Sequence, residues 1–235
     1  MDAYLGVDIS SGHWAGYLLG DRQDAAVVAD SIEELVAAAI EVARPNAIAI
    51  DVPIGPPTSG VRACDTAARA VLGGRSGTLF TAPAMAALEV ARHHEFGIEG
   101  YMEAAEANRA AQGVGLSRQA YGLAAKIMDV HDWLARGGAD GIPVIECHPE
   151  LSFAHLVNPR QPEPVPFRKT SWEGMRRRMK MLHGAGIDVQ YVRDQTGQIG
   201  ADDLLDAASA AWTARRYAAG NAVRLPAEGE PAIWA

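Results

Sequence analysis

Two aspartates of this sequence each end a short apolar run. Asp8 follows residues 5–7, Asp51 follows residues 47–50, and Glu146 repeats the arrangement later in the chain. Apolar runs bounded by turn residues are typical of buried strands. A carboxylate at the end of a buried strand is costly unless a positive charge meets it. These positions therefore indicate a site for a divalent cation, and Mg²⁺ prefers such oxygen ligands.

Three more aspartates, Asp202, Asp203 and Asp206, begin the last predicted helix. Asp203 and Asp206 are three residues apart and share one helix face, whereas Asp202 is expected to point elsewhere. The helix dipole favours acidic residues in a first turn, which accounts for Asp202 and Asp203 but less well for Asp206. We predict that Asp206 joins Asp8 and Asp51 as a metal ligand, with Asp203 assisting. The competing interpretation is that the strand-end aspartates only cap turns.

The stretch from Glu146 to Glu150, Glu-Cys-His-Pro-Glu, holds the most reactive side chains in one place. Strand alternation puts Glu146 and His148 on one side and turns Cys147 toward the core. Glu146 could be a further metal ligand or a base, and His148 could carry protons near neutral pH or pair with a local carboxylate. A zinc site is disfavoured, because no second Cys/His pair stands at zinc-finger spacing.

Basic residues offer candidate contacts for phosphate. Arg62 and Arg69 lie on one face of a predicted helix, with Asp65 between them. They form either a phosphate clamp, since guanidinium groups match phosphate geometry, or a surface ladder of ion pairs. Lys126 interrupts an apolar run. It is either a substrate contact or a surface lysine whose charged end reaches water along the apolar face. We interpret the basic run 176–180 as a solvated helix face rather than a nucleic-acid patch.

The first 52 residues predict three meandering strands, a helix and a strand that returns beside the first. The strands are expected at 3–8, 13–19, 25–29 and 47–51. Ser31 and Glu34 have the spacing of a capping box at the start of the helix. The glycine-rich dinucleotide fingerprint is missing after the first strand, which argues against a generic dinucleotide-binding fold.

After the fourth strand the pattern becomes helical. We predict helices near 61–72, 83–96, 98–112 and 116–136, with a flexible loop at 73–83. We interpret this block as an insertion over the edge of the sheet where open α/β sheets bind ligands. The remaining elements are a fifth strand at 142–147, a short helix after Glu150, a loop at 158–166, a basic helix at 172–183, an edge strand at 187–192 and a closing helix at 201–219.

Bulk composition agrees with a single packed domain over residues 1–235. A hydrophobic content of 49% argues against disorder. The net charge of −8 argues against broad attraction to nucleic acid, without excluding a local basic groove. The two cysteines fit a reducing compartment. With neither a leader peptide nor a run long enough to span a bilayer, we expect a cytoplasmic protein with no membrane contact.

Several motifs together resemble a known family. Asp8, Asp51 and the Asp-x-x-Asp-Ala of residues 203–207 resemble ribonuclease H-like proteins, above all those of the Holliday-junction-resolvase type. The chain from residue 4 to about residue 220 is similar to the family called domain of unknown function 429, described as predicted ribonuclease H-like nucleases. The motifs that carry the resemblance are Gly6-Val7-Asp8 with Gly12-His13-Trp14, Ile50-Asp51-Val52-Pro53-Ile54-Gly55, Arg62-Ala63-Cys64-Asp65 with Ala68-Arg69, Gly115-Leu116-Ser117-Arg118-Gln119-Ala120, Glu146-Cys147-His148-Pro149-Glu150 and Asp202-Asp203-Leu204-Leu205-Asp206-Ala207. Asp51 stands where the nuclease relatives usually carry glutamate, and its shorter reach could alter metal spacing.

The resemblance implies an α/β, ribonuclease H-like fold, with a mixed five-stranded sheet flanked by helices and a helical insertion at about 56–138 between strands four and five. It implies a metal-dependent nuclease that hydrolyses phosphodiester bonds with two Mg²⁺ or Mn²⁺ ions. Asp8, Asp51 and Asp206 would hold the ions, with Asp203 or Glu146 assisting. The candidate substrate contacts are Arg62, Arg69, Lys126 and His148. The expected partner is nucleic acid, DNA or RNA, or a phosphate-containing small molecule.

Two other functions stay open. An actin-like nucleotide phosphohydrolase or phosphotransferase shares this core topology, but it would need two core domains, each with a glycine-rich phosphate hairpin. A binding module that keeps the fold without the chemistry fits the acidic net charge. The sequence leaves the oligomeric state open, a dimer included.

Overall fold

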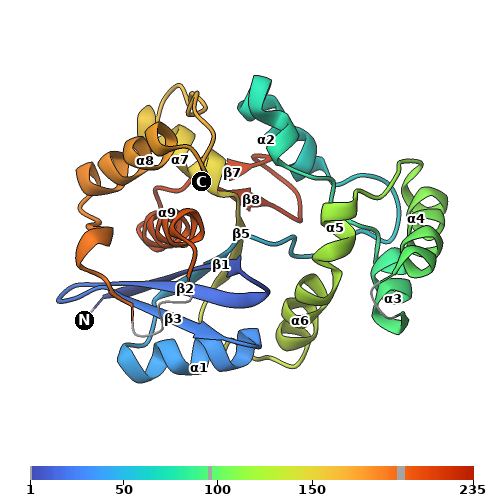
Figure 1. Ribbon diagram of the computed structural model, residues 1–235, viewed down its shortest axis with the longest axis horizontal. Helices are drawn as coiled ribbons and strands as arrows, with labels where there is room; N and C mark the ends of the chain where they lie inside the picture. Colours follow the sequence, from blue (N-terminus) through green and yellow to red (C-terminus); the bar gives the residue numbers. More distant parts are fainter. Residues whose placement is uncertain (1, 95–96, 195–198) are drawn as a thin grey trace.

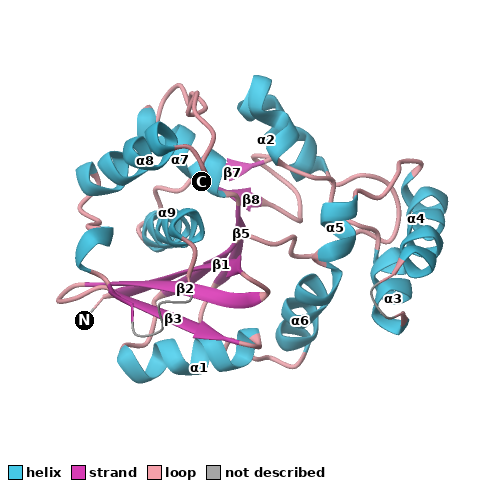
Figure 2. Cartoon of the chain, in the orientation of Figure 1, coloured by secondary structure: helices cyan, strands magenta, loops and turns pink. Residues whose placement is uncertain are grey.

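One mixed β-sheet flanked by helices forms the body of the protein (Figure 2). The computed structural model describes residues 2–94, 97–194 and 199–235. Within them the strands are ordered β6-β3-β2-β1-β4-β5-β8-β7, so the predicted α/β class and mixed sheet are confirmed. The expected number of five strands is too low. Pattern reasoning missed three two-residue strands at the sheet edges, which are too short to show any alternation: β6 (Arg193–Asp194), β7 (Arg224–Leu225) and β8 (Ile233–Trp234).

The first three strands form the predicted antiparallel meander. They are β1 (Ala3–Ser10), β2 (His13–Gly20) and β3 (Ala25–Ala29). Ser11 and Gly12 join the first two strands with φ of 50° and 86°. A two-residue hairpin loop with two positive φ values matches the right-handed twist of the flanking strands. This tight turn fixes the register in which Asp8 of β1 lies opposite Ala15 of β2.

The next three elements bring the carboxyl ends of three strands to one edge. Helix α1 (Ile32–Val42) begins with the predicted capping box of Ser31 and Glu34. Strand β4 (Ala47–Ile50) pairs in parallel with β1, and β5 (Val144–Cys147) pairs in parallel with β4. Because parallel strands end at the same edge, residues that follow β4 and β5 lie beside the end of β1.

Helices fill the chain between β4 and β5. They are α2 (Ala63–Leu72), the 3₁₀ helix η1 (Gly73–Thr78), α3 (Met85–His93), α4 (Ile98–Gln112), α5 (Arg118–Gly122) and α6 (Ala124–Ala135). The predicted helix at 116–136 is therefore two helices, separated at Leu123, and the predicted flexible loop begins as η1. Residues 95–96, the predicted end of the second helix, lie outside the described residues. In Figure 1, α3, α4 and α5 stand to one side of the sheet.

The last third of the chain returns to the sheet. It contains α7 (Pro149–Val157), α8 (Trp172–Gly184), the 3₁₀ helix η2 (Val189–Tyr191) and α9 (Ala201–Ala218). The edge strand predicted at 187–192 is wrong, because that segment forms η2 and the strand comes just after it, as β6. No helix among the described residues combines the length and apolar character that crossing a membrane requires.

Two hydrophobic cores cover the two faces of the sheet (Figure 1). On one face, side chains of α1 and α6 pack against the strands around Trp14 and Leu35. On the other face, α7, α8 and α9 enclose Tyr17, Phe153 and Leu205. Asp206 belongs to α9 and therefore reaches the carboxyl edge from the second face.

A glycine allows α9 to lie unusually close to β1. A Cβ atom added to Gly6 would lie 2.0 Å from the backbone oxygen of Ala207 and 2.1 Å from the backbone nitrogen of Ala211. Any larger side chain would push the helix away from the strand. Since Gly6 is two residues before Asp8, and Ala207 follows Asp206, this contact also brings the two carboxylates together.

Candidate functional site

Three predicted aspartates meet at the carboxyl edge of the sheet. Asp8 belongs to β1, and Asp51 follows β4 and donates its backbone N–H to the oxygen of Val7 at 2.9 Å. Asp206 arrives from α9. Asp8 and Asp206 are buried, with 8% and 4% of their surfaces exposed, and Asp51 is half-buried. Elements far apart in the sequence thus place three carboxylates within electrostatic reach of one another.

The carboxylates make one another harder to ionise. Burial, followed by the charges of Asp51 and Asp206, raises the pKa of Asp8 well above its ordinary value. Burial raises the pKa of Asp51 to about 7, and that of Asp206 to about 7, although Lys169 opposes both shifts. Like charges without enough compensation have this effect. The cluster therefore has a shortage of positive charge that a bound cation would supply.

Lys169 provides the cluster's nearest positive charge. Its Nζ lies 2.7 Å from Asp206 Oδ2, 3.6 Å from Asp202 Oδ2 and 3.7 Å from Asp203 Oδ1. Asp203 thus faces the same place as Asp206, as predicted from their spacing. The expectation that Asp202 points elsewhere is wrong, because the lysine reaches all three carboxylates at the start of α9. Sequence reasoning missed Lys169, which lies in a loop without periodic pattern.

Among the described residues, the carboxylates of this cluster have the chemistry that a divalent metal needs, but not the arrangement. Carboxylate oxygens with raised pKa values are suitable ligands for Mg²⁺ or Mn²⁺. Over residues 2–94, 97–194 and 199–235, however, no group of three or more His, Cys, Asp or Glu side chains is arranged to hold a metal ion. The chemistry of the donors therefore fits the metal, while Lys169 already contacts Asp206 Oδ2 and would compete with a metal for that oxygen.

Glu146 belongs to a separate, closed cluster. Arg62 Nη1 and Nη2 donate to its two carboxylate oxygens at 2.8 Å each, and the Ile54 N–H donates at 2.7 Å. Arg62 also donates to Asp65 Oδ1, through Nη2 at 2.5 Å and Nε at 3.1 Å. Only 5% of Arg62 is exposed. In this arrangement Arg62 holds protein carboxylates in place of a phosphate, and both carboxylate oxygens of Glu146 already accept hydrogen bonds.

Two other predicted substrate contacts, Arg69 and Lys126, bind other parts of the protein instead. Arg69 Nη2 donates to Thr81 Oγ1 at 2.8 Å and to the oxygen of Leu79 at 3.3 Å, which holds the segment after η1. Lys126 Nζ donates to the oxygen of Asp30 at 2.9 Å and lies 5.0 Å from the centre of the Trp14 ring. Lys126 is on α6, across the sheet from α9, in the position of a snorkelling lysine.

His148 lines the same pocket as Asp51 and Asp206. Its Nε2 lies 3.4 Å from the oxygen of Thr78, and its Nδ1 is buried without a hydrogen-bond partner among the described residues. Burial lowers the pKa of the imidazole, which favours its neutral form. A neutral imidazole with one unpartnered nitrogen can accept a proton or a hydrogen bond from a bound molecule.

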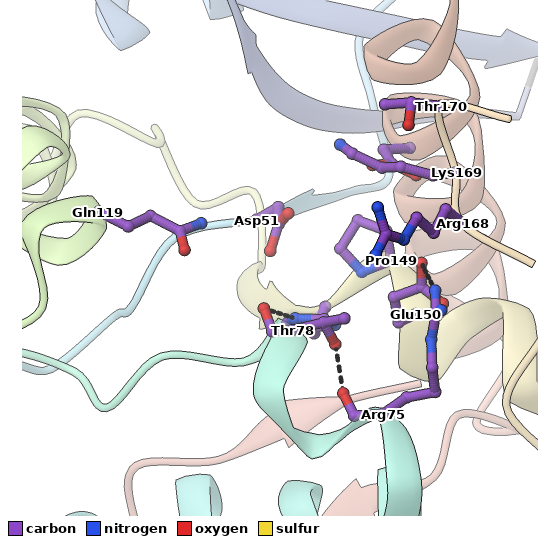
Figure 3. Close-up of a pocket in the computed structure, with 11 residues that line it drawn as sticks. Asp51, Arg75, Thr78, Gln119, Pro149, Glu150, Arg168, Lys169 and Thr170 are labelled. Atoms are coloured by element: carbon purple, nitrogen blue, oxygen red, sulfur yellow. Dashed lines mark hydrogen bonds and ion pairs between the residues drawn. The ribbon is translucent and has the colours of Figure 1, made fainter.

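A pocket of ≈ 400 Å³ extends from the aspartates. Asp51 and Asp206 line it together with three basic residues that the sequence analysis did not select as substrate contacts: Arg75, Arg168 and Lys169. The Arg168 guanidinium is exposed and makes no hydrogen bond or ion pair with any described residue. Figure 3 shows Asp51 between Gln119 on one side and Arg168 and Lys169 on the other.

Arg75 is held loosely in this pocket. Its Nη2 lies 3.5 Å from both Glu150 Oε1 and the oxygen of Phe167, and its Nε is buried without a partner in the described chain. Glu150 is held instead by Arg178, at 2.5 Å. Arg178 is fully buried, so the predicted solvated face of α8 is wrong at this residue. Arg75 therefore has donors to offer to a ligand, whereas Arg178 has a structural partner.

Comparisons with known proteins supply a family and no activity. No curated protein and no solved structure matches the chain. A family model described as "Protein of unknown function (DUF429)" matches residues 6–230, nearly the whole chain. The family expected from the motifs is therefore confirmed, and the chain belongs to the DUF429 family.

Proposed function

We propose that this protein is a metal-dependent hydrolase of phosphodiester bonds that acts on nucleic acid at the pocket beside Asp8, Asp51 and Asp206. One observation carries the proposal. Three carboxylates with raised pKa values meet beside a pocket; Asp51 and Asp206 line it, and so do Arg75 and Arg168, which have no strong partner among the described residues. A phosphate ester together with a divalent cation complements both the acids and the arginines at once.

The carboxylates would hold one or two Mg²⁺ or Mn²⁺ ions. Asp8 and Asp51 come from neighbouring strands that pair in parallel, so their spacing is fixed by the sheet. Asp206 is fixed by the close packing of α9 on Gly6. When bound, the metal supplies an activated water and stabilises the leaving oxygen of the ester.

The basic residues would orient the phosphate. Within the described part of the chain, the Arg168 guanidinium has no partner and Arg75 has only long contacts to give up. Guanidinium groups from two separate segments can bind different oxygens of one phosphate and so fix its orientation. His148 lines the same pocket, and its buried Nδ1, unpartnered among the described residues, would accept a hydrogen bond from a group that reaches it.

The order of the central strands supports a ribonuclease H-like assignment, which forms part of the proposal. Three antiparallel strands in meander are followed by a helix and by a parallel strand that returns beside the first. Asp8 on the first of these strands, Asp51 after the fourth and Asp206 on the last helix are the positions that resemble ribonuclease H-like proteins. Ligands of open α/β sheets bind at the carboxyl ends of the strands, where the three aspartates lie.

The test is cleavage of single-stranded, duplex and branched oligonucleotides in millimolar Mn²⁺. The Asp8→Asn variant should lose at least about 100-fold in rate, since even partners of metal ligands change activity by 10- to 100-fold. Asp140→Asn is a matched control, because Asp140 is exposed and pairs with Arg44 away from the site. Cleavage by Asp8→Asn at the parental rate, or a parental rate unchanged by chelator, would refute the proposal.

A further inference from the structure

The most exposed large apolar side chain among the described residues lies next to the pocket. Trp172, the first residue of α8, has 76% of its surface exposed. Residues 176, 180 and 183 follow it at helical spacing, so Arg176, Lys180 and His183 share its face of the helix. These four side chains line a hollow of ≈ 470 Å³, together with Met179, Asp188 and Gln190.

The basic residues on this face differ from their neighbours in the same helix. Arg178 is buried against Glu150, and the Arg177 guanidinium lies 4.6 Å from the centre of the Phe167 ring. By contrast, Lys180 has no ion pair or hydrogen bond to any described residue. Arg176 pairs with Glu173 at 2.9 Å but stays more than half exposed. The hollow therefore presents cations and an aromatic ring to solvent.

Other charges facing the hollow are few. His183 Nδ1 lies 3.3 Å from Asp188 Oδ2, so the lining acid already has a partner. Arg176 and Lys180 outnumber this carboxylate in the lining, and Glu173, which pairs with Arg176, lies outside it, so Lys180 is the cation without an acidic partner among the described residues. A negatively charged ligand is favoured here even though the whole chain has a net charge of −8.

The hollow is connected along the chain to the carboxylate pocket. Lys169 and Thr170 line that pocket, and Trp172 begins α8 directly after the cap residue Ser171. Trp172 comes three positions after Lys169, so the Cα atoms of the two residues lie at most about 11 Å apart. From Trp172 to His183 the helix face runs for about 16 Å, at 1.5 Å per residue. One ligand strand can therefore occupy both places.

We propose that this face of α8 binds single-stranded nucleic acid, with an unpaired base stacked on Trp172 and backbone phosphates on Arg176 and Lys180. The inference rests on the proposed function and names its substrate class. Aromatic side chains bind single strands by stacking, which a paired base inside a duplex does not offer. A stripe one helix wide, on a chain of negative net charge, also lacks the broad basic surface that contacts to both duplex strands need.

Binding is tested in chelator, without metal, by fluorescence anisotropy of an end-labelled oligothymidylate. Trp172→Ala should weaken binding about tenfold or more, because stacking contributes roughly 1–3 kcal/mol per base. Trp172→Phe should restore most of the affinity, since it keeps an aromatic face. Met102→Ala is the matched control: Met102 is 65% exposed on α4, away from the hollow, and should change nothing.

The charge contribution is measured by repeating the titration over a range of salt concentrations. Lys180→Gln should reduce the slope of log affinity against log salt by about 0.7, the value for one phosphate contact on a single strand. Arg136→Gln removes the same charge from an exposed site paired with Glu33 and should leave the slope unchanged.

The outcomes separate this inference from the proposed function. Oligothymidylate binding that depends on Trp172, without cleavage in Mn²⁺, would support the inference and count against the nuclease. Cleavage with binding unaffected by Trp172→Ala would overturn the inference alone. Tighter binding of a duplex than of the single strand, or equal competition by polyglutamate, would also overturn it.

Discussion

Two clusters of charged side chains lie next to each other at the carboxyl edge of the sheet, and they are built differently. One contains Arg62, Asp65 and Glu146, and Asp51 lines a small pocket beside it. The other contains the three aspartates at positions 8, 51 and 206, together with Lys169. Both are largely buried and both have more acids than bases. The difference lies in their hydrogen bonds.

In the first cluster every carboxylate oxygen accepts a hydrogen bond. Arg62 and the Ile54 N–H satisfy Glu146, while Arg62 and the Ala82 N–H satisfy Asp65. In the second cluster the Asp51 carboxylate accepts no hydrogen bond from the described residues. Buried acids that are fully hydrogen-bonded stabilise one conformation, whereas acids left without donors are open to a ligand. This contrast separates a structural cluster from a candidate site.

The largest effect is expected from breaking the closed cluster. Arg62→Met leaves Glu146 and Asp65 buried without their shared cation, and removal of one partner of a buried ion pair costs about 3–5 kcal/mol of unfolding free energy. Urea unfolding followed by circular dichroism measures it. Arg75→Met is the matched control, and it should cost less than about 1 kcal/mol because its contacts are long and partly exposed. Equal losses in the two variants would contradict the contrast between the clusters.

The cluster of Asp8, Asp51, Asp206 and Lys169 is the open cluster. It should make the protein less stable as pH rises, whereas an ion-paired acid with a lowered pKa makes a protein more stable as pH rises. The pKa values of Asp51 and Asp206 are about 7 in the folded protein, above the usual value of about 3.9. At pH values between these two pKa values, the folded protein binds protons that the unfolded chain does not bind. The cluster's contribution to the unfolding free energy therefore increases as pH falls below about 7. This stabilising contribution disappears as pH rises through about 7.

Thermal unfolding in chelator, compared at about pH 8 and about pH 5.5, tests this dependence. Asp51→Asn should stabilise the protein by about 1–3 kcal/mol at the higher pH and by less at the lower pH, because the amide carries no charge to repel its neighbours. The Asp140→Asn variant should follow the parent at both values. A destabilised Asp51→Asn variant at the higher pH would mean that the cluster is adequately compensated as it stands.

The same contrast shows how far the sequence can predict this molecule. Periodicity and caps placed the first four strands and α1, because those signals are local: the Ser31–Glu34 box and the turn at Ser11 and Gly12 depend on adjacent residues. The expected parallel pairing of the first and fourth strands placed Asp51 beside Asp8, although β1 continues two residues beyond Asp8, where the prediction ended it. The short strands β6 to β8 depend on partners far away in the chain and have no local signal.

The roles of the basic residues were the part of the candidate site that the sequence predicted least well. Arg62 and Arg69 share a helix face, and that spacing is the same whether the face meets a ligand or the protein's own carboxylates. Arg168 and Lys169 follow a proline-rich loop without periodicity, so nothing in the sequence directed them at the aspartates. Which cation meets which acid is decided by tertiary packing, which local patterns do not record.

The smallest expected effect concerns the one base of the open cluster. Lys169→Gln should tighten Mn²⁺ binding about tenfold, equal to 1.4 kcal/mol, because the metal no longer has to displace an ammonium 2.7 Å from Asp206. Isothermal titration measures the affinity directly and does not depend on activity. Lys180→Gln removes the same charge from the face of α8 and should leave Mn²⁺ affinity unchanged. Mn²⁺ binding that is unchanged or weaker in Lys169→Gln would show that the lysine and the metal do not compete, and that the three aspartates are not the metal's ligands.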